Sequence, residues 1–364
     1  MGSLFDYLDW RGDLRFSETG LGEVDGLILS LLSYIDFEGI VPAHHGEGEA
    51  PVTLLNATRQ YLRRNRGKNA YLGVIVPPDI VSLAAKASKS RRFGDMRLCG
   101  YVNRVNSEEQ KQFCAMTFLL SDGTAFVSFR GTDDTLVGWK ENFNMSFLDT
   151  VPAQEDAVAY LEQAAQSISA PLYVGGHSKG GNLAVFAAVR CQPNLKERLR
   201  TVFNYDGPGF SKGFIEGADY QSIRHKLKTV VPDSSVVGML LEHEETYEVV
   251  KSNATGLLQH NGFSWEVLGG KFIHLNTVTG ESRLIDSALK SWLDEMSVEE
   301  RERVVDSLYE TLSAVGAKTL TELNTEKIKL VKAWGSLDPK TRSVLLKCVS
   351  LLLRPKPQAV KKAK

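Results

Sequence analysis

The chain has 364 residues, with 43 lysines and arginines, 44 aspartates and glutamates, and a hydrophobic share of 43%. This composition is typical of a soluble globular protein and excludes an intrinsically disordered chain. A formal net charge of −1 argues against nucleic acid as a partner, because domains that bind nucleic acid are usually strongly basic.

Cysteine usage and hydropathy bear on the compartment. The four cysteines form no Cys-x-x-Cys pair, which excludes a zinc ribbon and a dense disulfide framework and favours free thiols in a reducing compartment. The N-terminus lacks the apolar core of a signal peptide, and no apolar stretch approaches the ~20 residues that span a bilayer. We therefore expect a cytoplasmic protein without a transmembrane segment.

Residues 1–99 are predicted to form a mixed, largely helical part that packs on the core, with helices over 22–34 and 78–88. Charge is uneven here, because residues 1–50 hold two basic and ten acidic residues and residues 51–100 hold ten basic and two acidic. Either the two segments neutralise each other across neighbouring surfaces, or the basic residues form an anion- or membrane-facing patch around Arg63, Arg64, Arg66 and Lys68.

Residues 100–280 are predicted to form an α/β core. The apolar runs 112–120 and 124–129 flank Ser121-Asp122-Gly123, a strong hairpin signal. Strand and helix patterns then alternate, with a helix at 154–168, a strand at 171–174, a helix at 183–190, and strands at 201–205 and 227–231. This alternation predicts a mostly parallel sheet with helices on both faces.

Residues 281–353 are predicted to be a helical C-terminal region. Ser297 and Glu300 form a capping box before a helix through residue 312, and two further helices are expected at 321–334 and 340–353. Residues 354–364 hold five basic residues and two prolines, so we expect a disordered basic tail that could make weak contact with a membrane surface.

The most informative motif is Gly176-His177-Ser178-Lys179-Gly180, which matches G-x-S-x-G between an apolar strand and an alanine-rich helix. This is the context of a nucleophile elbow, in which a sharp turn exposes the serine at the edge of a sheet. The alternative is a glycine-rich turn whose serine has no catalytic role.

A nucleophilic serine also needs hydrogen-bond donors for the oxyanion. We expect the backbone N–H of Lys179 to be one donor, and Thr132, at the end of the strand-like run 125–132, to supply another.

The sequence FRGT at 129–132, followed by GHSKGG at 176–181, resembles the class 3 (fungal-type) lipases of the α/β-hydrolase superfamily. The FDYLDWRGDL start and the NYDGPGF segment also resemble a bacterial family of lipase-like proteins of unknown function. The lipase resemblance covers about 113–260 and implies Ser178 as nucleophile, with Thr132 and Lys179 as oxyanion donors. Lys179 departs from the leucine that is usual in the classical lipases.

The base must be a histidine that follows Ser178, and the acid a carboxylate between the two, because this is the chain order of α/β-hydrolases. His260 is preferred, since it lies in a turn-rich loop at the position of the lipase histidine. The acid is either Asp206, in a turn after one strand, or Asp233, after the next strand. The remaining histidines are His225 in a charged stretch, His243 among acidic residues where we expect it to be solvated, and His274 in a strand pattern.

These patterns predict a serine esterase that acts on a small-molecule or lipid ester through an acyl-enzyme, without a metal or organic cofactor. A thioesterase, amidase or peptidase on the same scaffold is the related alternative, because a fold does not determine its substrate. A non-catalytic binding protein that retains the elbow is the third hypothesis. The acyl chain, the head group, the presence of a lid and the oligomeric state are not predicted.

Overall fold

The computed structural model describes residues 2–45, 50–66, 76–145, 147–239, 241, 243, 245–280, 296–313, 316–319, 321–322, 335, 339, 342–343 and 346. The predicted helices at 321–334 and 340–353 lie largely outside the described residues, and the predicted tail at 354–364 lies wholly outside them.

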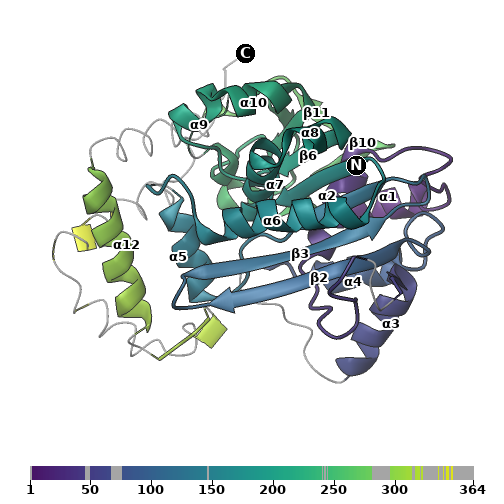
Figure 1. The fold of residues 1–364 in the computed structure, drawn as a ribbon, viewed down its shortest axis with the longest axis horizontal. Coiled ribbons are helices and arrows are strands. Elements are labelled where there is room, and N and C mark those ends of the chain that lie inside the picture. Colours follow the sequence, from purple (N-terminus) through teal and green to yellow (C-terminus); the bar gives the residue numbers. More distant parts are fainter. Residues whose placement is uncertain are drawn as a thin grey trace, which may run out of the picture.

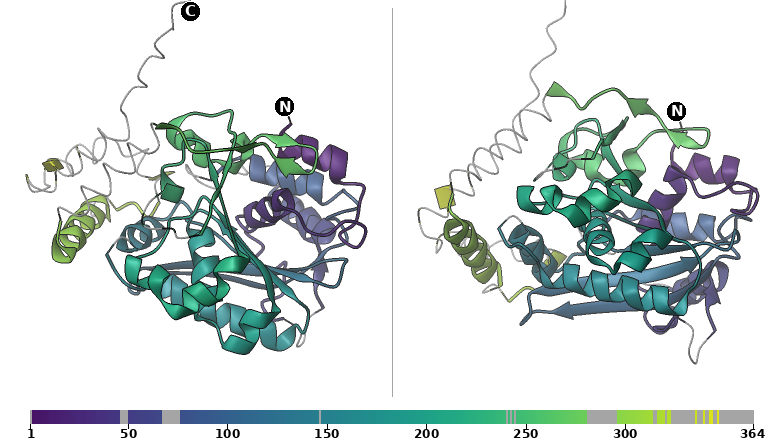
Figure 2. Two further views of the ribbon diagram at one scale, coloured as in Figure 1. Left: turned by 90° about the horizontal axis from the view of Figure 1, so that it is seen from above. Right: turned by 45° about the horizontal axis from the view of Figure 1, so that its top comes forward.

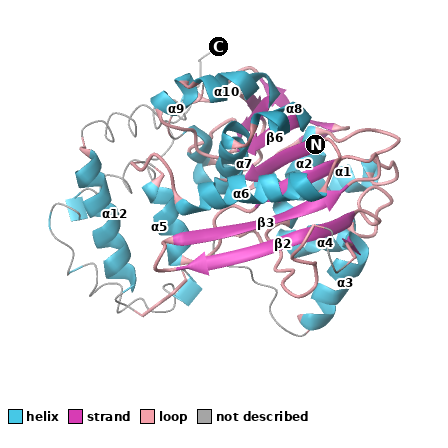
Figure 3. Ribbon diagram, viewed as in Figure 1, coloured by secondary structure: helices cyan, strands magenta, loops and turns pink. Residues whose placement is uncertain are grey.

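A nine-stranded sheet in the order β1-β2-β3-β4-β5-β6-β7-β8-β11 forms the centre of the described residues (Figures 1 and 3). The neighbours from β4 to β8 are parallel, whereas the pairs β1-β2, β2-β3, β3-β4 and β8-β11 are antiparallel. Its strands are β1 (Val52–Thr53), β2 (Arg97–Asn106), β3 (Lys111–Leu119), β4 (Ala125–Phe129), β5 (Leu172–His177), β6 (Leu199–Tyr205), β7 (Leu227–Pro232), β8 (Glu248–Val250) and β11 (His274–Leu275). A separate antiparallel pair consists of β9 (Val267–Leu268) and β10 (Lys271–Phe272).

Helices cover both faces of this sheet, as Figure 2 shows from two further directions. The N-terminal helices are α1 (Leu4–Arg11), α2 (Glu23–Leu32), α3 (Leu54–Arg64) and α4 (Asp79–Ala87). The later helices are α5 (Leu136–Asn144), α6 (Pro152–Ser167), α7 (Lys179–Arg190), α8 (Pro193–Arg198), α9 (Lys212–Glu216), α10 (Ala218–Ile223) and α12 (Val298–Ser313). Short 3-10 turns are η1 (Arg224–Lys226), η2 (Val237–Met239), η3 (Gly256–His260) and η4 (Gly262–Ser264).

Two hydrophobic clusters, one on each side of the sheet, explain this layering. Successive side chains of a strand point to opposite faces. In β4, Phe126 belongs to the cluster that contains Leu27 of α2, whereas Val127 belongs to the cluster that contains Leu183 of α7. The core therefore lies in two layers around the parallel strands. The predicted α/β class is confirmed, with parallel strands from β4 to β8 at the centre of the sheet, helices on both faces and a helix in the C-terminal region.

The uneven charge of the first hundred residues is neutralised between neighbouring segments. Lys86 pairs with Asp9 at 2.6 Å, and Arg91 pairs with Glu18 at 3.1 Å. A third pair is completely buried, with Arg92 Nη2 2.6 Å from Asp25 Oδ2 of α2. These contacts favour the first of the two interpretations, in which acidic and basic surfaces meet. None of the helices in the described part of the chain combines the length and apolarity needed to cross a bilayer.

Candidate active site

Ser178 stands at the turn between β5 and α7, as the motif predicts. Its backbone has φ 60° and ψ −133°, a conformation that non-glycine residues rarely adopt and that costs about 1–3 kcal/mol. The flanking glycines are required by space, because a Cβ at Gly176 would overlap the backbone of Gly180, and one at Gly180 would overlap the carbonyl of Phe129. The strained turn therefore presents Ser178 at the carboxyl edge of the parallel strands, directly before the N-terminus of α7.

The turn after β4 lies against this serine. A Cβ built on Gly131 would lie 3.1 Å from the Cβ of Ser178, so the glycine allows the two turns to meet. Thr132 is buried, and in the described part of the chain its Oγ1 has no hydrogen-bond partner. Lys179 is the first residue of α7, where a backbone N–H has no acceptor within its own helix. Of the two predicted oxyanion donors, Lys179 thus follows Ser178 in the chain, and Thr132 belongs to the turn that lies against Ser178 in space.

His260, at the end of η3, is held by Asp206. The Nδ1 atom of His260 lies 2.6 Å from Asp206 Oδ2, and the aspartate is completely buried whereas the histidine side chain is about one quarter exposed. The other oxygen of Asp206 accepts the hydroxyl of Ser235 at 2.5 Å and the backbone N–H of Gly238 at 3.1 Å. Asp206 also has a positive φ of 51°, as Ser178 does. This network holds the Asp206 carboxylate within hydrogen-bonding distance of the His260 ring.

The other sequence candidates lie elsewhere. Asp233 follows β7, and its Oδ1 has no hydrogen-bond partner among the described residues. The side chain of His243, expected to be solvated, is instead buried, with Nδ1 3.1 Å from the buried carboxylate of Glu245, two residues along the chain. Burial of Glu245 is outweighed by hydrogen bonds to its carboxylate, so its pKa is lowered to about 2. His225 is exposed, and His274 lies in β11.

The Lys179 side chain has a role that sequence reasoning missed. Its Nζ is fully buried and donates to Gln112 O at 2.6 Å, to Gln112 Oε1 at 2.7 Å and to Glu141 Oε2 at 2.9 Å. The Glu141 carboxylate, also fully buried, accepts the backbone N–H groups of Gln112 and Ala153. This network links β3, α5, α6 and the first residue of α7. Its only sequence signal is a lysine in an otherwise apolar and glycine-rich segment.

Loss of the Lys179 amine is expected to destabilise the protein strongly. Lys179→Met keeps the backbone N–H but leaves the Glu141 carboxylate buried without its counter-charge, which typically costs about 3–5 kcal/mol of unfolding free energy. Urea denaturation measures this loss. The double variant Lys179→Met/Glu141→Gln should lose less unfolding free energy than Lys179→Met alone, because the glutamine amide at position 141 carries no charge. Lys196→Met breaks a pair with the exposed Asp219 and should cost under about 1 kcal/mol. Equal losses in the single and double variants would contradict the assignment.

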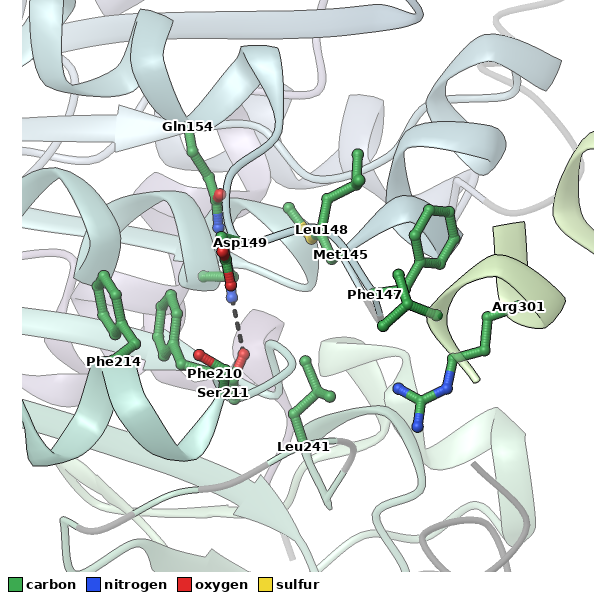
Figure 4. Close-up of a pocket in the computed structure, with 13 residues that line it drawn as sticks. Met145, Phe147, Leu148, Asp149, Gln154, Phe210, Ser211, Phe214, Leu241 and Arg301 are labelled. Atoms are coloured by element: carbon green, nitrogen blue, oxygen red, sulfur yellow. Dashed lines mark hydrogen bonds between the residues drawn. The ribbon is translucent and has the colours of Figure 1, made fainter. Parts of the chain in front are cut away.

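A pocket of about 160 Å³ opens beside the first turn of α7 (Figure 4). The stacked rings of Phe210 and Phe214, 4.5 Å apart, lie on one side of it, and Phe147 and Arg301 of α12 lie on the other. Asn182 of α7 borders the pocket and donates to the carbonyl of Gly209 at 3.0 Å. The pocket lining is therefore mixed, with aromatic side chains beside the charged Asp149 and Arg301 and the amides of Gln154 and Asn182.

One cluster of possible metal ligands lies at the β8–β11 edge. Glu23, Glu248 and His274 offer ligand atoms within 4.8 Å of one another. The Lys228 ammonium lies 2.8 Å from Glu23 and 3.2 Å from Glu248 and pairs with both carboxylates. We therefore assign this cluster to an ion-pair network rather than to a metal centre.

The solved structures that are similar to this chain include lipases. Similar solved structures include the Rhizomucor miehei lipase–propeptide complex (18% identity, 44% of this chain and 58% of that chain, TM-score 0.34) and a triacylglycerol lipase from Penicillium expansum (11%, 52% and 77%, 0.34). M37 lipase matches at 13% identity over 58% of this chain and 67% of that chain, with a TM-score of 0.34. The match spans less than two thirds of the first of these structures.

No curated protein matches the chain. The sequence model of one family, described as Mbeg1-like, matches residues 87–310. This match takes in Ser178, the turn after β4 with Thr132, Asp206 and His260, and it covers more than half of the 364 residues. The chain therefore belongs to the Mbeg1-like family.

Proposed function

We propose that this protein is a serine hydrolase that cleaves carboxylic esters through an acyl-enzyme on Ser178. The observation that carries the proposal is the 2.6 Å contact between His260 Nδ1 and Asp206 Oδ2, beside a serine in a strained strand-to-helix turn. His260 lies next to the elbow, because its carbonyl is 2.7 Å from Nε2 of His177, the residue before the serine. A nucleophile, a base and an orienting acid in this chain order are the parts that acyl transfer needs.

In the proposed reaction, His260 accepts the proton of the Ser178 hydroxyl as the oxygen attacks the ester carbonyl. Asp206 keeps the Nδ1–H tautomer of His260 and stabilises the imidazolium that forms. The imidazolium then protonates the leaving alcohol, and the acyl group stays on Ser178. Water deprotonated by His260 attacks this acyl-enzyme and releases the carboxylic acid, which restores the serine. The chain's own side chains balance every proton, so the proposal includes no metal or organic cofactor.

The Thr132 hydroxyl is proposed as an oxyanion donor, together with the backbone N–H of Lys179. Its support is a buried Oγ1 that has no hydrogen-bond partner among the described residues, in the residue after Gly131, which lies against Ser178. We expect Thr132→Ala to reduce kcat by about 10²–10³-fold, as loss of one such donor typically does. Thr132→Ser restores a hydroxyl and should recover most of the rate. Initial rates on a p-nitrophenyl ester measure both. An unchanged rate in Thr132→Ala would leave only its backbone N–H as a donor.

The substrate is proposed to be a small-molecule or lipid ester with an apolar acyl group. Phe147, Phe210 and Phe214 make the pocket beside α7 suitable for hydrocarbon, and Arg301 places a positive charge near its edge. A cytoplasmic location fits the described cysteines, Cys99, Cys114 and Cys191, which are all free thiols. A panel of p-nitrophenyl esters of increasing chain length would define the acyl preference, and matched thioesters and anilides would detect the related activities.

Labelling with a fluorophosphonate probe tests the proposed function directly. An activated serine becomes covalently phosphonylated, and peptide mass spectrometry should locate the adduct on Ser178. The Ser178→Ala variant and the heat-denatured wild type serve as controls and should remain unlabelled. If the folded wild-type protein also remains unlabelled, the proposal fails and a non-catalytic binding protein becomes the better interpretation.

A further inference from the structure

The proposed reaction gives no role to His177, which is buried between two partners that belong to different parts of the site. Its Nε2 lies 2.7 Å from the backbone carbonyl of His260, and its Nδ1 lies 3.4 Å from the hydroxyl of Tyr34. The rings of His177 and His260 are 4.7 Å apart. Tyr34 comes from the N-terminal part of the chain, just after α2 and outside the residues that the family model matches.

The partners of His177 determine its tautomer. A backbone carbonyl can only accept, so the ring must carry its proton on Nε2 and donate it to His260 O. Its Nδ1 is then free to accept the Tyr34 hydroxyl. Burial, and next the neighbouring His260, lower the pKa of His177 to about 3, which keeps the ring neutral near pH 7. His177 is therefore suited to hold a backbone rather than to transfer protons.

The Tyr34 hydroxyl also reaches the oxyanion turn. The hydroxyl lies against Gly131, because a Cβ built on this glycine would overlap it and lie 2.6 Å from the carbonyl of His177. A continuous series of contacts thus runs from Gly131 through Tyr34 and His177 to the backbone of His260. It joins the turn that carries Thr132 to the loop that carries the proposed base.

We propose that Tyr34 and His177 are positioning residues, which hold the His260 backbone and the oxyanion turn in register with Ser178. The inference rests on the proposed function, because it assigns these contacts a role in ester hydrolysis. Asp206 anchors the ring of His260, but the ring is partly exposed and lies in a loop, so its placement also depends on its backbone. A shift of 1 Å in such a group can reduce the rate by roughly 10²-fold.

Three substitutions at His177 separate positioning from simple packing. The amide of His177→Gln reaches the Nε2 position and can still donate to His260 O, whereas the shorter amide of His177→Asn cannot, and His177→Leu has no donor. We expect Asn and Leu to lower kcat by roughly 10–100-fold with KM changed by less than about twofold. Gln should recover most of kcat. Titration with the fluorophosphonate probe gives the fraction of competent sites, so that kcat refers to folded protein.

Matched controls come from a second buried histidine and tyrosine. His45 contacts Thr117 and Tyr160, and Tyr160 donates to the carbonyl of Gly100, all away from the proposed triad. His45→Leu and Tyr160→Phe should lower the melting temperature but leave kcat per folded site unchanged. Tyr34→Phe should lower kcat several-fold, and less so in the His177→Leu background, where its partner is already absent.

Three results would overturn the inference while the proposed function stands. The first is an equal loss of kcat in His177→Gln and His177→Leu, and the second is a kcat that follows melting temperature across all variants, controls included. The third is an unchanged kcat in both His177→Leu and Tyr34→Phe. By contrast, a wild-type protein that neither reacts with the probe nor hydrolyses esters overturns the proposed function and this inference together.

Discussion

Ser178→Ala is expected to lower kcat for ester hydrolysis by roughly 10⁶-fold, as removal of a triad nucleophile typically does. Alanine retains the Cβ and can occupy the same turn at φ 60°, and the close packing of Gly176 against Gly180 does not change. The hydroxyl alone is lost, and no acyl-enzyme can form. Burst and steady-state measurements on a p-nitrophenyl ester detect this directly, since both phases should disappear.

A stability measurement separates loss of chemistry from loss of fold in this variant. Relief of a rarely populated backbone conformation is not expected, because alanine is also a non-glycine residue, so the melting temperature should change little. A variant that folds normally and hydrolyses esters at the wild-type rate would exclude Ser178 as the nucleophile. The rest of the proposed mechanism would then have no acceptor for the acyl group.

Asp206→Asn is expected to lower kcat by about 10⁴-fold, because it reverses the hydrogen bond that orients His260. The amide can keep its oxygen toward Ser235 and Gly238, which donate to Asp206 Oδ1. Its NH₂ group then faces Nδ1 of His260 and donates where the carboxylate accepts. The imidazole must carry its proton on Nε2, so it cannot take the proton from the serine hydroxyl.

Asp233→Asn is the matched control for this prediction. It makes the same chemical change after the neighbouring strand, at a side chain whose Oδ1 has no hydrogen-bond partner among the described residues. Its kcat should stay within a few-fold of wild type. If Asp233→Asn lowered kcat by about 10⁴-fold and Asp206→Asn remained active, the acid would be Asp233. The contact of Asp206 with His260 would then be structural.

Much of the fold could be predicted from short-range patterns. Short apolar runs predict β4 and β5, and the Ser121-Asp122-Gly123 turn predicts the hairpin of β3 with β4 that the structure contains. Boundaries differ by a few residues, since β5 runs to His177 and α7 begins at Lys179, where the sequence pattern begins the helix only at Leu183. The residues at the elbow are mostly glycine or polar, so the hydrophobic pattern does not show that the strand and the helix extend into it.

The N-terminal helices show where such patterns become insufficient. An apolar stretch at 22–34 predicts a helix, but it does not say which strands the helix covers. In the structure, Leu27 packs in the same cluster as Phe126 of β4, and the hydroxyl of Tyr34 reaches His177. A segment outside the lipase resemblance thereby contacts the candidate active site.

The sequence by itself determined the elbow, because its glycines and its serine act through steric limits within a few residues of chain. Only the tertiary structure shows that Asp206, rather than Asp233, contacts His260, since this contact joins residues 54 positions apart and depends on how two loops pack. It also decided that the Lys179 amine is buried against Glu141. A charge pattern predicts exposure for such a lysine. Its burial is possible only because carbonyl and carboxylate oxygens from distant elements converge on the amine.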